Sequence, residues 1–423
     1  MWETLRNVWR VPELRKKVLY TFFMLLIYRL VSVIPAPGVD VQAVQSAMGQ
    51  YDMLGLVNMM TGNAFGQMTI MAMGISPYIN ASIIMQLLTI AIPALERLSK
   101  DGGEEGKKKI NRITRYVTVG LAALQAIGII AGLQAIKPSY ANFFGYMTIG
   151  IIMAGGTALA MWIGERITKN GIGNGISLLI FAGIISNLFN GTLAAAANVF
   201  NGGGMHAVGQ LATIVIATLV ILVIVTFVDM AERRIPVQYA KRVVGRKMYG
   251  GQSTHIPLKL LSVGVLPLIF AYSFMAFPGT ILAMFGTSSA AYKWWSANMT
   301  QSSPWYMIVC ALLIIAFSYF YTSITFNPED IAKNIQQQGG HIPGIRTGSK
   351  TVEFLKRTSN RLTLFAALFL AILSTIPSLL TVWQQVSIPF GASSILIAVS
   401  VAIETVRQVE SQLVMRNYKG FLG

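Results

Sequence analysis

The chain has 423 residues, of which 54% are hydrophobic and only 12% are charged, whereas roughly 25% of residues are charged in an ordinary soluble domain. That composition excludes a soluble globular fold, because so few charges could not solvate its surface. Lys and Arg total 33 against 16 Asp and Glu, a net charge of +17. In a soluble protein this excess would indicate nucleic-acid binding, but in a membrane protein it also sets orientation.

The first predicted element is a cytoplasmic amphipathic segment, residues 1–17. Trp2, Leu5 and Trp9 fall on one helical face while basic residues lie elsewhere, as in a helix that lies in the membrane interface. The apolar run that follows, from Val18 to Pro35, has no small-residue cleavage site. We therefore expect it to be retained as the first span rather than removed as a signal peptide.

Apolar runs long enough to cross a bilayer recur along the chain, since about 20 helical residues cross a hydrocarbon core of roughly 30 Å. The predicted fold class is therefore an all-α membrane protein with ten transmembrane helices. The fifth run is the weakest, because Asn190-Gly191 follows closely after it, so it is either short or extends through the alanines at 194–197. The spans are predicted at residues 18–36, 70–93, 113–136, 146–164, 175–190, 208–228, 261–285, 305–326, 362–383 and 388–406.

Basic residues give an independent test of this count, because Lys and Arg collect in cytoplasmic loops. If the N-terminus is cytoplasmic, every Lys and Arg lies in a cytoplasmic segment except Lys137, Lys293 and Arg29. The first two lie in external loops, and Arg29 lies within the first span. The alternation indicates ten spans with both termini in the cytoplasm.

Ten spans divide into two groups of five at a glycine-rich external loop, residues 191–207. An odd number of spans inverts the second group, so the segments 18–190 and 208–406 are predicted to be inverted, pseudo-symmetric five-helix halves with a pathway at their interface. Residues 407–423 are predicted to form a cytoplasmic tail.

Two cytoplasmic loops, residues 229–260 and 327–361, are longer and more basic than orientation requires. Both contain Gly and Pro residues that favour protruding turns. Such loops bind anionic lipid, an acidic protein face or RNA phosphate. The pattern leaves open whether they dock a partner or only set topology and contact membrane lipid.

Motifs for catalysis or cofactor binding are not found in the sequence. The segment 102–109, GGEEGKKK, lacks the spacing and the hydroxyl of a phosphate-binding loop, and GIGNGIS at 171–177 lacks a preceding strand. The three histidines are scattered, and Cys310 lies alone within an apolar run, so no metal site is expected. We predict that the chain is not an enzyme and has no cofactor.

Ionisable residues are nearly absent from the predicted spans, which hold Arg29 and, near the inner end of the tenth, Glu404. A secondary transporter usually places carboxylates at mid-membrane to bind its coupling ion. Their absence disfavours a ten-span transporter and leaves any energy for transport to a partner. A scaffold whose basic loops recruit a cytosolic protein is a third possibility.

Several long blocks of the sequence resemble the SecY family of bacterial protein-translocation channels. They are Met71–Leu88, Glu165–Ser177, Arg233–Arg242, Gln252–Lys259 and Phe326–Thr351. The blocks occur in the family's order and agree with the predicted topology. The resemblance implies a gated central pore between the two halves that translocates unfolded, signal-bearing polypeptides and inserts membrane proteins into the cytoplasmic membrane.

By that resemblance, an apolar ring closes the pore. Two pairs of its residues are four apart, so each pair stacks on one face of a helix, and such a ring excludes ions by dewetting. Isoleucine in a membrane helix otherwise faces lipid or neighbouring helices. The ring positions are Ile79, Ile83, Ile176, Ile180, Ile269 and Ile397.

The segment 54–68 is too short and too polar to span the membrane. The resemblance implies that it is a plug which fills the outer side of the idle pore; without the resemblance it would be an external loop helix. The plug residues expected are Asn58, Met59, Met60, Thr61, Gly62 and Asn63.

The resemblance also implies a lateral gate to lipid, between spans two and three on one side and seven and eight on the other. Polar residues there, which also suit ordinary helix packing, are Asn80, Gln86, Ser273, Thr322 and Thr325. The basic loops would dock the ribosome or the SecA ATPase motor, through Arg242, Arg246 and Arg346. SecE is expected as a required partner, and SecG as a usual one.

Overall fold

Long helices form most of the chain. The computed structural model describes residues 9, 11–50, 58, 61–100, 102–200, 204–239, 242–244, 247–249, 253–261, 264, 266–284, 289–299, 303–384 and 392–419. Ten long helices each overlap one predicted span: α2 (Pro12–Val31), α5 (Ser76–Ala91), α7 (Gly103–Gly132), α8 (Phe143–Asn170), α9 (Gly175–Phe200), α10 (Gly204–Met230), α11 (Leu266–Met284), α13 (Pro304–Thr325), α15 (Ser349–Gln384) and α16 (Ala392–Lys419).

Length and composition alone support a multi-pass membrane protein. Among the described residues, six helices are long and apolar enough to cross a membrane, and α5 with α6 (Pro93–Lys100) would add a seventh. These two helices are bent by 104° at the break between them, where Pro93 begins α6, because a proline disfavours helical backbone at the residue before it. The arrangement is consistent with the ten predicted spans.

Most of the predicted spans differ from the helices at their ends, and two of these differences are informative. The fifth extends through the alanines, since α9 runs from Gly175 to Phe200, which settles the alternative left open by the sequence. The second was predicted from residue 70, but α5 begins at Ser76 with Pro77 in its first turn. Residues 61–75 form turns instead.

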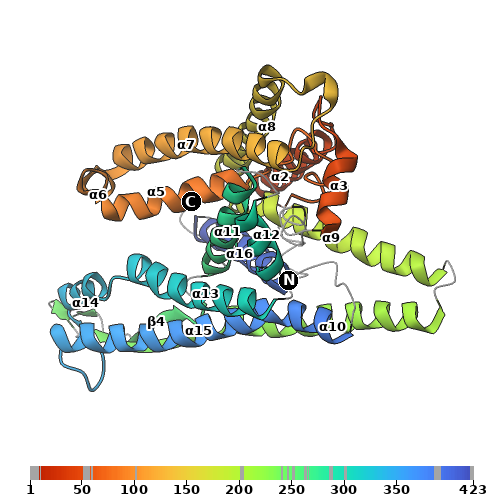
Figure 1. Ribbon diagram of the computed structural model, residues 1–423. Helices are drawn as coiled ribbons and strands as arrows, with labels where there is room; N and C mark the ends of the chain where they lie inside the picture. The colour runs from red at the N-terminus through yellow and green to blue at the C-terminus, as the bar shows by residue number, and fades with distance from the viewer. Residues whose placement is uncertain are drawn as a thin grey trace.

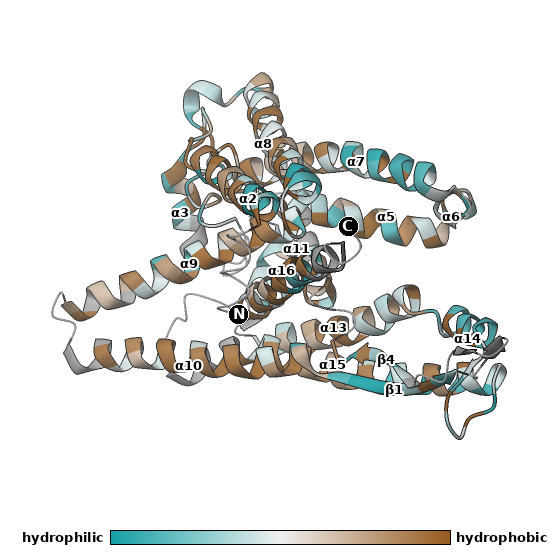
Figure 2. Ribbon diagram, turned by 180° about the vertical axis from the view of Figure 1, so that it is seen from behind, coloured by the Kyte–Doolittle hydropathy of each residue, from teal (hydrophilic) through white to brown (hydrophobic). Residues whose placement is uncertain are grey.

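Short helices and strands connect these long helices. They are α3 (Val41–Gln50), the 3₁₀ helix η1 (Pro138–Tyr140), α12 (Ala290–Asn298), α14 (Pro328–Gln337), β1 (Glu232–Tyr239), β2 (Arg242–Val244), β3 (Lys247–Tyr249), β4 (Ser253–Lys259) and β5 (Gly340–His341). The turn at α6 and the segment at α14 project on the same side of the molecule, while α9 and α10 extend on the opposite side (Figure 1). Hydrophilic residues gather at the α6 end of α7, on β1 and on α14, whereas α10 is largely hydrophobic (Figure 2).

Three buried clusters organise the membrane helices. One lies among α10, α11, α13, α15 and α16 and includes Leu268, Ile314 and Leu396. A second joins residues 36–73 to α7 and α8 and includes Phe65 and Met153. The third, here called the central cluster, contains Ile79, Ile180, Ile269 and Ile397 and therefore combines helices from early and late in the chain.

The two basic loops come together in one folded unit, here called the loop module. It consists of β1, β4, β5, α14 and the first turns of α15. The strands form an antiparallel sheet in the order β4-β1-β5, in which Gln238 pairs with His341. Ile235, Ile335 and Leu355 are buried in its own small core. The sequence pattern predicts that both loops protrude, and it does not indicate that they pair with each other.

We expect Leu355→Ala to destabilise the loop module by about 2–5 kcal/mol, because Leu355 is fully buried in its core and truncation leaves a cavity. Limited proteolysis of the purified protein should then cut the module faster. Lys356→Ala changes the exposed neighbour on the same helix and should leave the rate unchanged. Equal cleavage of both variants would contradict the packing described.

Candidate functional site

The six predicted ring isoleucines converge on the central cluster from four helices. Ile79, Ile180, Ile269 and Ile397 are buried in the cluster, and Ile83 and Ile176 pack against it while partly buried. They come from α5, α9, α11 and α16. Residues separated by as many as 318 positions therefore form one aliphatic contact region.

The glycine-rich sequence before α9 explains how two of these isoleucines are positioned. The side chain of Asn174 accepts hydrogen bonds from the amides of Ile176 and Ser177, at 3.1 and 3.4 Å, which satisfies free amides at the start of the helix. A Cβ at Gly175 would lie 2.0 Å from the Gly164 carbonyl oxygen, so only glycine allows α8 and α9 to approach this closely. The motif therefore starts a helix rather than binding a nucleotide.

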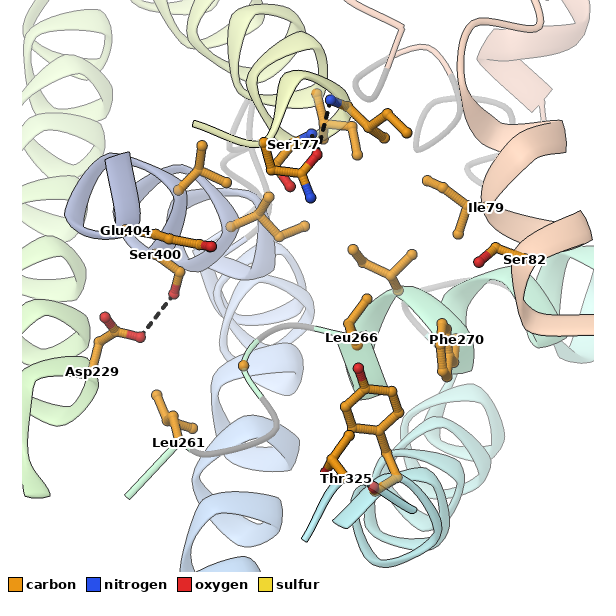
Figure 3. Close-up of a pocket in the computed structure, with 18 of the residues that line it drawn as sticks. Ile79, Ser82, Ser177, Asp229, Leu261, Leu266, Phe270, Thr325, Ser400 and Glu404 are labelled. Carbon is orange, nitrogen blue, oxygen red and sulfur yellow. Dashed lines mark hydrogen bonds between the residues drawn. The ribbon is translucent and has the colours of Figure 1, made fainter. Parts of the chain in front are cut away.

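A cavity of about 580 Å³ adjoins the central cluster. Five of the six isoleucines line it, Ile83 being the exception. Figure 3 shows Ile79 and Ser82 from α5 facing Phe270 of α11, with Thr325 of α13 nearby. The cavity thus lies where α5, α9, α11, α13 and α16 meet.

One wall of the cavity carries ionisable and polar side chains. Ser400 of α16 donates a hydrogen bond to the carboxylate of Asp229 on α10, at 3.0 Å (Figure 3). Glu404, Arg407 and Lys259 also line the cavity. The cavity lining is therefore polar and charged at these residues, in contrast to the aliphatic lining at the central cluster.

The predicted plug, residues 54–68, is described at residue 58, which is helical, and at residues 61–68, which form turns and are mostly buried. Thr61 and Gly62 are buried and Asn63 is half-buried, while Met59 and Met60 lie outside the described residues. The Asn58 side chain donates to the Asn63 side chain at 2.8 Å and accepts from the Gly66 amide at 2.7 Å. These bonds hold a compact turn after the helical residue 58.

This segment and the turns that follow it, residues 69–75, touch the central cluster directly. Ala64 and Met71 are 1% and 0% exposed and belong to the same cluster as the ring isoleucines. Phe65 and Met68 are buried instead in the cluster formed with α7 and α8. The segment is therefore packed between the central cluster on one side and α7 and α8 on the other.

The predicted lateral-gate residues do not all lie together. Gln86 and Thr325 line the cavity from α5 and α13, and Asn80 is half-buried on α5. Thr322 faces α15, where its hydroxyl accepts a hydrogen bond from Thr363 at 3.1 Å, so its side chain is used within the later helices. Ser273 lies in α11, and its side chain is outside the described part of the structure.

Aromatic side chains line the same region. Phe270 makes edge-to-face contacts with Phe317 and Tyr321, with ring centroids 5.9 and 6.1 Å apart, and Phe274 contacts Phe317 at 6.2 Å. They join α11 to α13, while α11 also packs against α7 and α5. α11 therefore forms the border between early and late helices.

Of the three predicted docking arginines, the structure describes the side chain of only one, Arg346. Arg346 is exposed on the turn between β5 and α15, and its carbonyl accepts a hydrogen bond from the Thr351 hydroxyl at 3.0 Å. Nearby, Lys350 donates to Glu353 at 2.9 Å, which lowers the pKa of that carboxyl. Arg242 lies in β2 without a described side chain, and Arg246 is outside the described residues.

Among the described residues, no group of three or more His, Cys, Asp or Glu side chains could hold a metal ion. The ionisable residues that line the cavity include both acidic and basic side chains. The sequence pattern did not predict two features: the Asp229–Ser400 hydrogen bond, and the hydrogen bond from the Arg29 guanidinium to the Gly62 carbonyl oxygen. The intramembrane position of Arg29 was a usable signal, because such charges usually have a specific partner.

These features define a multi-pass α-helical membrane protein with a central aliphatic cluster, a buried turn segment packed against it and an adjoining cavity. The SecY family profile matches residues 69–406. The protein translocase subunit SecY of Streptomyces galbus is 43% identical over 435 aligned residues, which cover 98% of each chain. The chain belongs to the SecY family.

Solved channel structures share the fold. One describes how the plug domain of a SecY protein stabilises the closed state of the translocation channel and maintains a membrane seal; its TM-score is 0.68 at 20% identity, covering 94% of this chain and 92% of that one. Another is Sec61 in the canine ribosome–channel complex from the endoplasmic reticulum, with a TM-score of 0.66 at 18% identity, covering 94% and 92%.

Proposed function

We propose that the chain is the central subunit of a protein-conducting channel, which translocates unfolded secretory polypeptides across the cytoplasmic membrane and inserts membrane proteins into it. The observation that carries the proposal is the convergence of six isoleucines from α5, α9, α11 and α16 beside the cavity. An aliphatic ring excludes water and ions when closed. It has no hydrogen bonds to break when its side chains part around an extended polypeptide.

In this proposal residues 54–68 are the plug, with Asn58, Thr61, Gly62 and Asn63 in its described part and Met59 and Met60 between them. Burial of Ala64 in the central cluster supports the role, and so does the plug domain described for the related SecY structure. The plug would leave the cluster when a polypeptide enters.

We further propose that the border between α5 with α7 and α11 with α13 is the lateral exit to lipid. Gln86 and Thr325 support this role, since both line the cavity. The side chains of Gln86 and Thr325 donate hydrogen bonds within their own helices, to Ser82 and to the Tyr321 carbonyl oxygen, so opening the border need not break either bond. Asn80 and Ser273 are assigned to the same border.

The loop module is proposed to dock the SecA motor or the ribosome, through Arg242, Arg246 and Arg346. Its exposed basic residues support docking to an acidic protein face or to RNA phosphate, and the related Sec61 lies in a ribosome–channel complex. SecE and SecG are the proposed membrane partners. The chain itself would catalyse no reaction, so the motor or the ribosome would supply the energy.

The proposed orientation places both termini, the segment 1–17 and the tail 407–423 in the cytoplasm. The five-helix halves 18–190 and 208–406 would face each other across the pore and be joined by the external loop 191–207. The distribution of Lys and Arg carries this assignment.

Reconstitution tests the function. Liposomes containing the chain with SecE and SecG should, on addition of SecA and ATP, protect an unfolded, signal-bearing preprotein from external protease. Liposomes without the chain should give no protection. Equal protection with and without the chain would contradict the proposal.

A further inference from the structure

Arg29 is a charged residue near the end of the apolar helix α2, and its guanidinium turns toward the interior of the protein. Nη1 donates a hydrogen bond to the Gly62 carbonyl oxygen at 3.1 Å, and Nη2 donates to the Ser186 hydroxyl of α9. An arginine near a helix end can extend to the membrane surface. Here it instead joins α2, α9 and the proposed plug.

The backbone of the plug is shaped to admit this guanidinium. Gly62 has a φ of +66°, and a Cβ there would lie 2.6 Å from Arg29 Nη1 and 3.0 Å from the Gly183 Cα. A larger residue would displace the arginine or separate the plug from α9. The close approach therefore depends on glycine in this left-handed conformation.

A neighbouring residue on α9 reaches the same segment. The side chain of Asn187 donates to the Asn58 carbonyl oxygen at 3.3 Å. The Thr61 hydroxyl donates to that carbonyl at 3.1 Å and accepts from the Phe65 amide at 3.2 Å. Arg29 and Asn187 therefore donate hydrogen bonds to backbone oxygens of the plug. The turn that contains these oxygens is also stabilised by its own hydrogen bonds.

Resting on the function proposed above, we propose that Arg29 is a positioning residue that holds residues 61–75 against the central cluster in the closed channel. A charge-assisted hydrogen bond is strong in a low-dielectric environment. Its acceptors, a carbonyl and a hydroxyl, are neutral, so release of the plug separates no ion pair. The guanidinium then remains close enough to the helix end to be hydrated, which makes the contact reversible.

Thiol labelling measures this directly, because the chain has a single cysteine, Cys310. Ala64→Cys in a Cys310→Ser background places a thiol at a plug position that is 1% exposed. Adding Arg29→Gln should raise its labelling rate with a water-soluble maleimide about tenfold, because the plug leaves the cluster more often. Arg29→Lys, which keeps the charge but not the two-pronged geometry, should give an intermediate rate.

Two controls separate positioning from general loosening. Native Cys310 is 2% exposed in a different cluster, so its labelling rate in a chain with only Arg29→Gln should stay at the wild-type value. Arg115→Gln removes an arginine that pairs with Glu165 at 2.7 Å and should not change labelling at Ala64→Cys. Ser186→Ala, which leaves the Gly62 bond in place, should raise it only a few-fold.

The proposal is overturned if Arg29→Gln leaves the Ala64→Cys rate at the wild-type value, or if Cys310 labelling rises in parallel. Its failure is distinct from failure of the proposed function. If the unsubstituted chain protects preprotein but Arg29→Gln changes no labelling rate, only the positioning role is wrong. If labelling responds but no preprotein is protected, the channel function is wrong.

Discussion

Replacing Ile83 and Ile180 with serine should raise the resting ion conductance of the reconstituted protein by about tenfold or more, because polar side chains let water persist in a constriction that aliphatic side chains keep dry. Ile180 is buried in the central cluster and Ile83 packs against it. The same variant should accept preproteins with defective signal sequences, since a weaker seal opens more readily. Planar-bilayer recording and a translocation assay measure the two effects.

Ile216→Ser is the matched control, because Ile216 is 61% exposed on the outer face of α10. It makes the same chemical change away from the central cluster and should leave the conductance unchanged. Thermal unfolding of all variants reports any cost to folding. Unchanged conductance in the double variant with a normal unfolding temperature would favour the scaffold interpretation over a pore.

Charge reversal at Arg346 is expected to lower SecA-driven translocation about tenfold, which corresponds to roughly 1.4 kcal/mol. Arg346 is exposed on the loop module, so Arg346→Glu should preserve the fold while opposing an acidic partner face. Binding of SecA to vesicles should weaken with added salt for the unsubstituted protein, and less steeply for the variant. Proteoliposome assays at several salt concentrations provide the measurement.

Lys293→Glu makes the equivalent reversal at an exposed residue of α12, in a loop assigned to the external side. It should leave translocation unchanged. If it impairs translocation as much as Arg346→Glu, net charge rather than a docking surface explains the effect. Normal translocation by Arg346→Glu would remove Arg346 from the proposed surface.

Family resemblance, more than local pattern, predicted that these six isoleucines lie together. Pairs of isoleucines four residues apart mark one face of a helix, and the family resemblance identified which faces meet. All six positions lie in or against one cluster. Each predicted span also overlaps a helix, because apolar length is a strong signal.

Features that depend on distant segments escaped prediction. The β1–β5 pairing joins two basic loops that are separated by α11, α12 and α13, and nothing in either loop specifies the other as its partner. The hydroxyl of Thr322 accepts a hydrogen bond from Thr363 on α15. The polarity of Thr322 alone did not indicate which helix its side chain faces. Residues 70–75 are apolar enough that they were predicted to belong to the second span. In the structure they form turns, with Gly74 at a φ of +52° just before α5 begins.

In the proposed channel, a polypeptide passes between the isoleucines of α5, α9, α11 and α16. A photo-crosslinking amino acid at residue 180, with a preprotein stalled midway across proteoliposomes, shows whether the polypeptide follows this path. We expect crosslinks from position 180 to the stalled preprotein and none from position 216 on α10. If position 180 crosslinks to lipid alone, the polypeptide does not pass between these isoleucines.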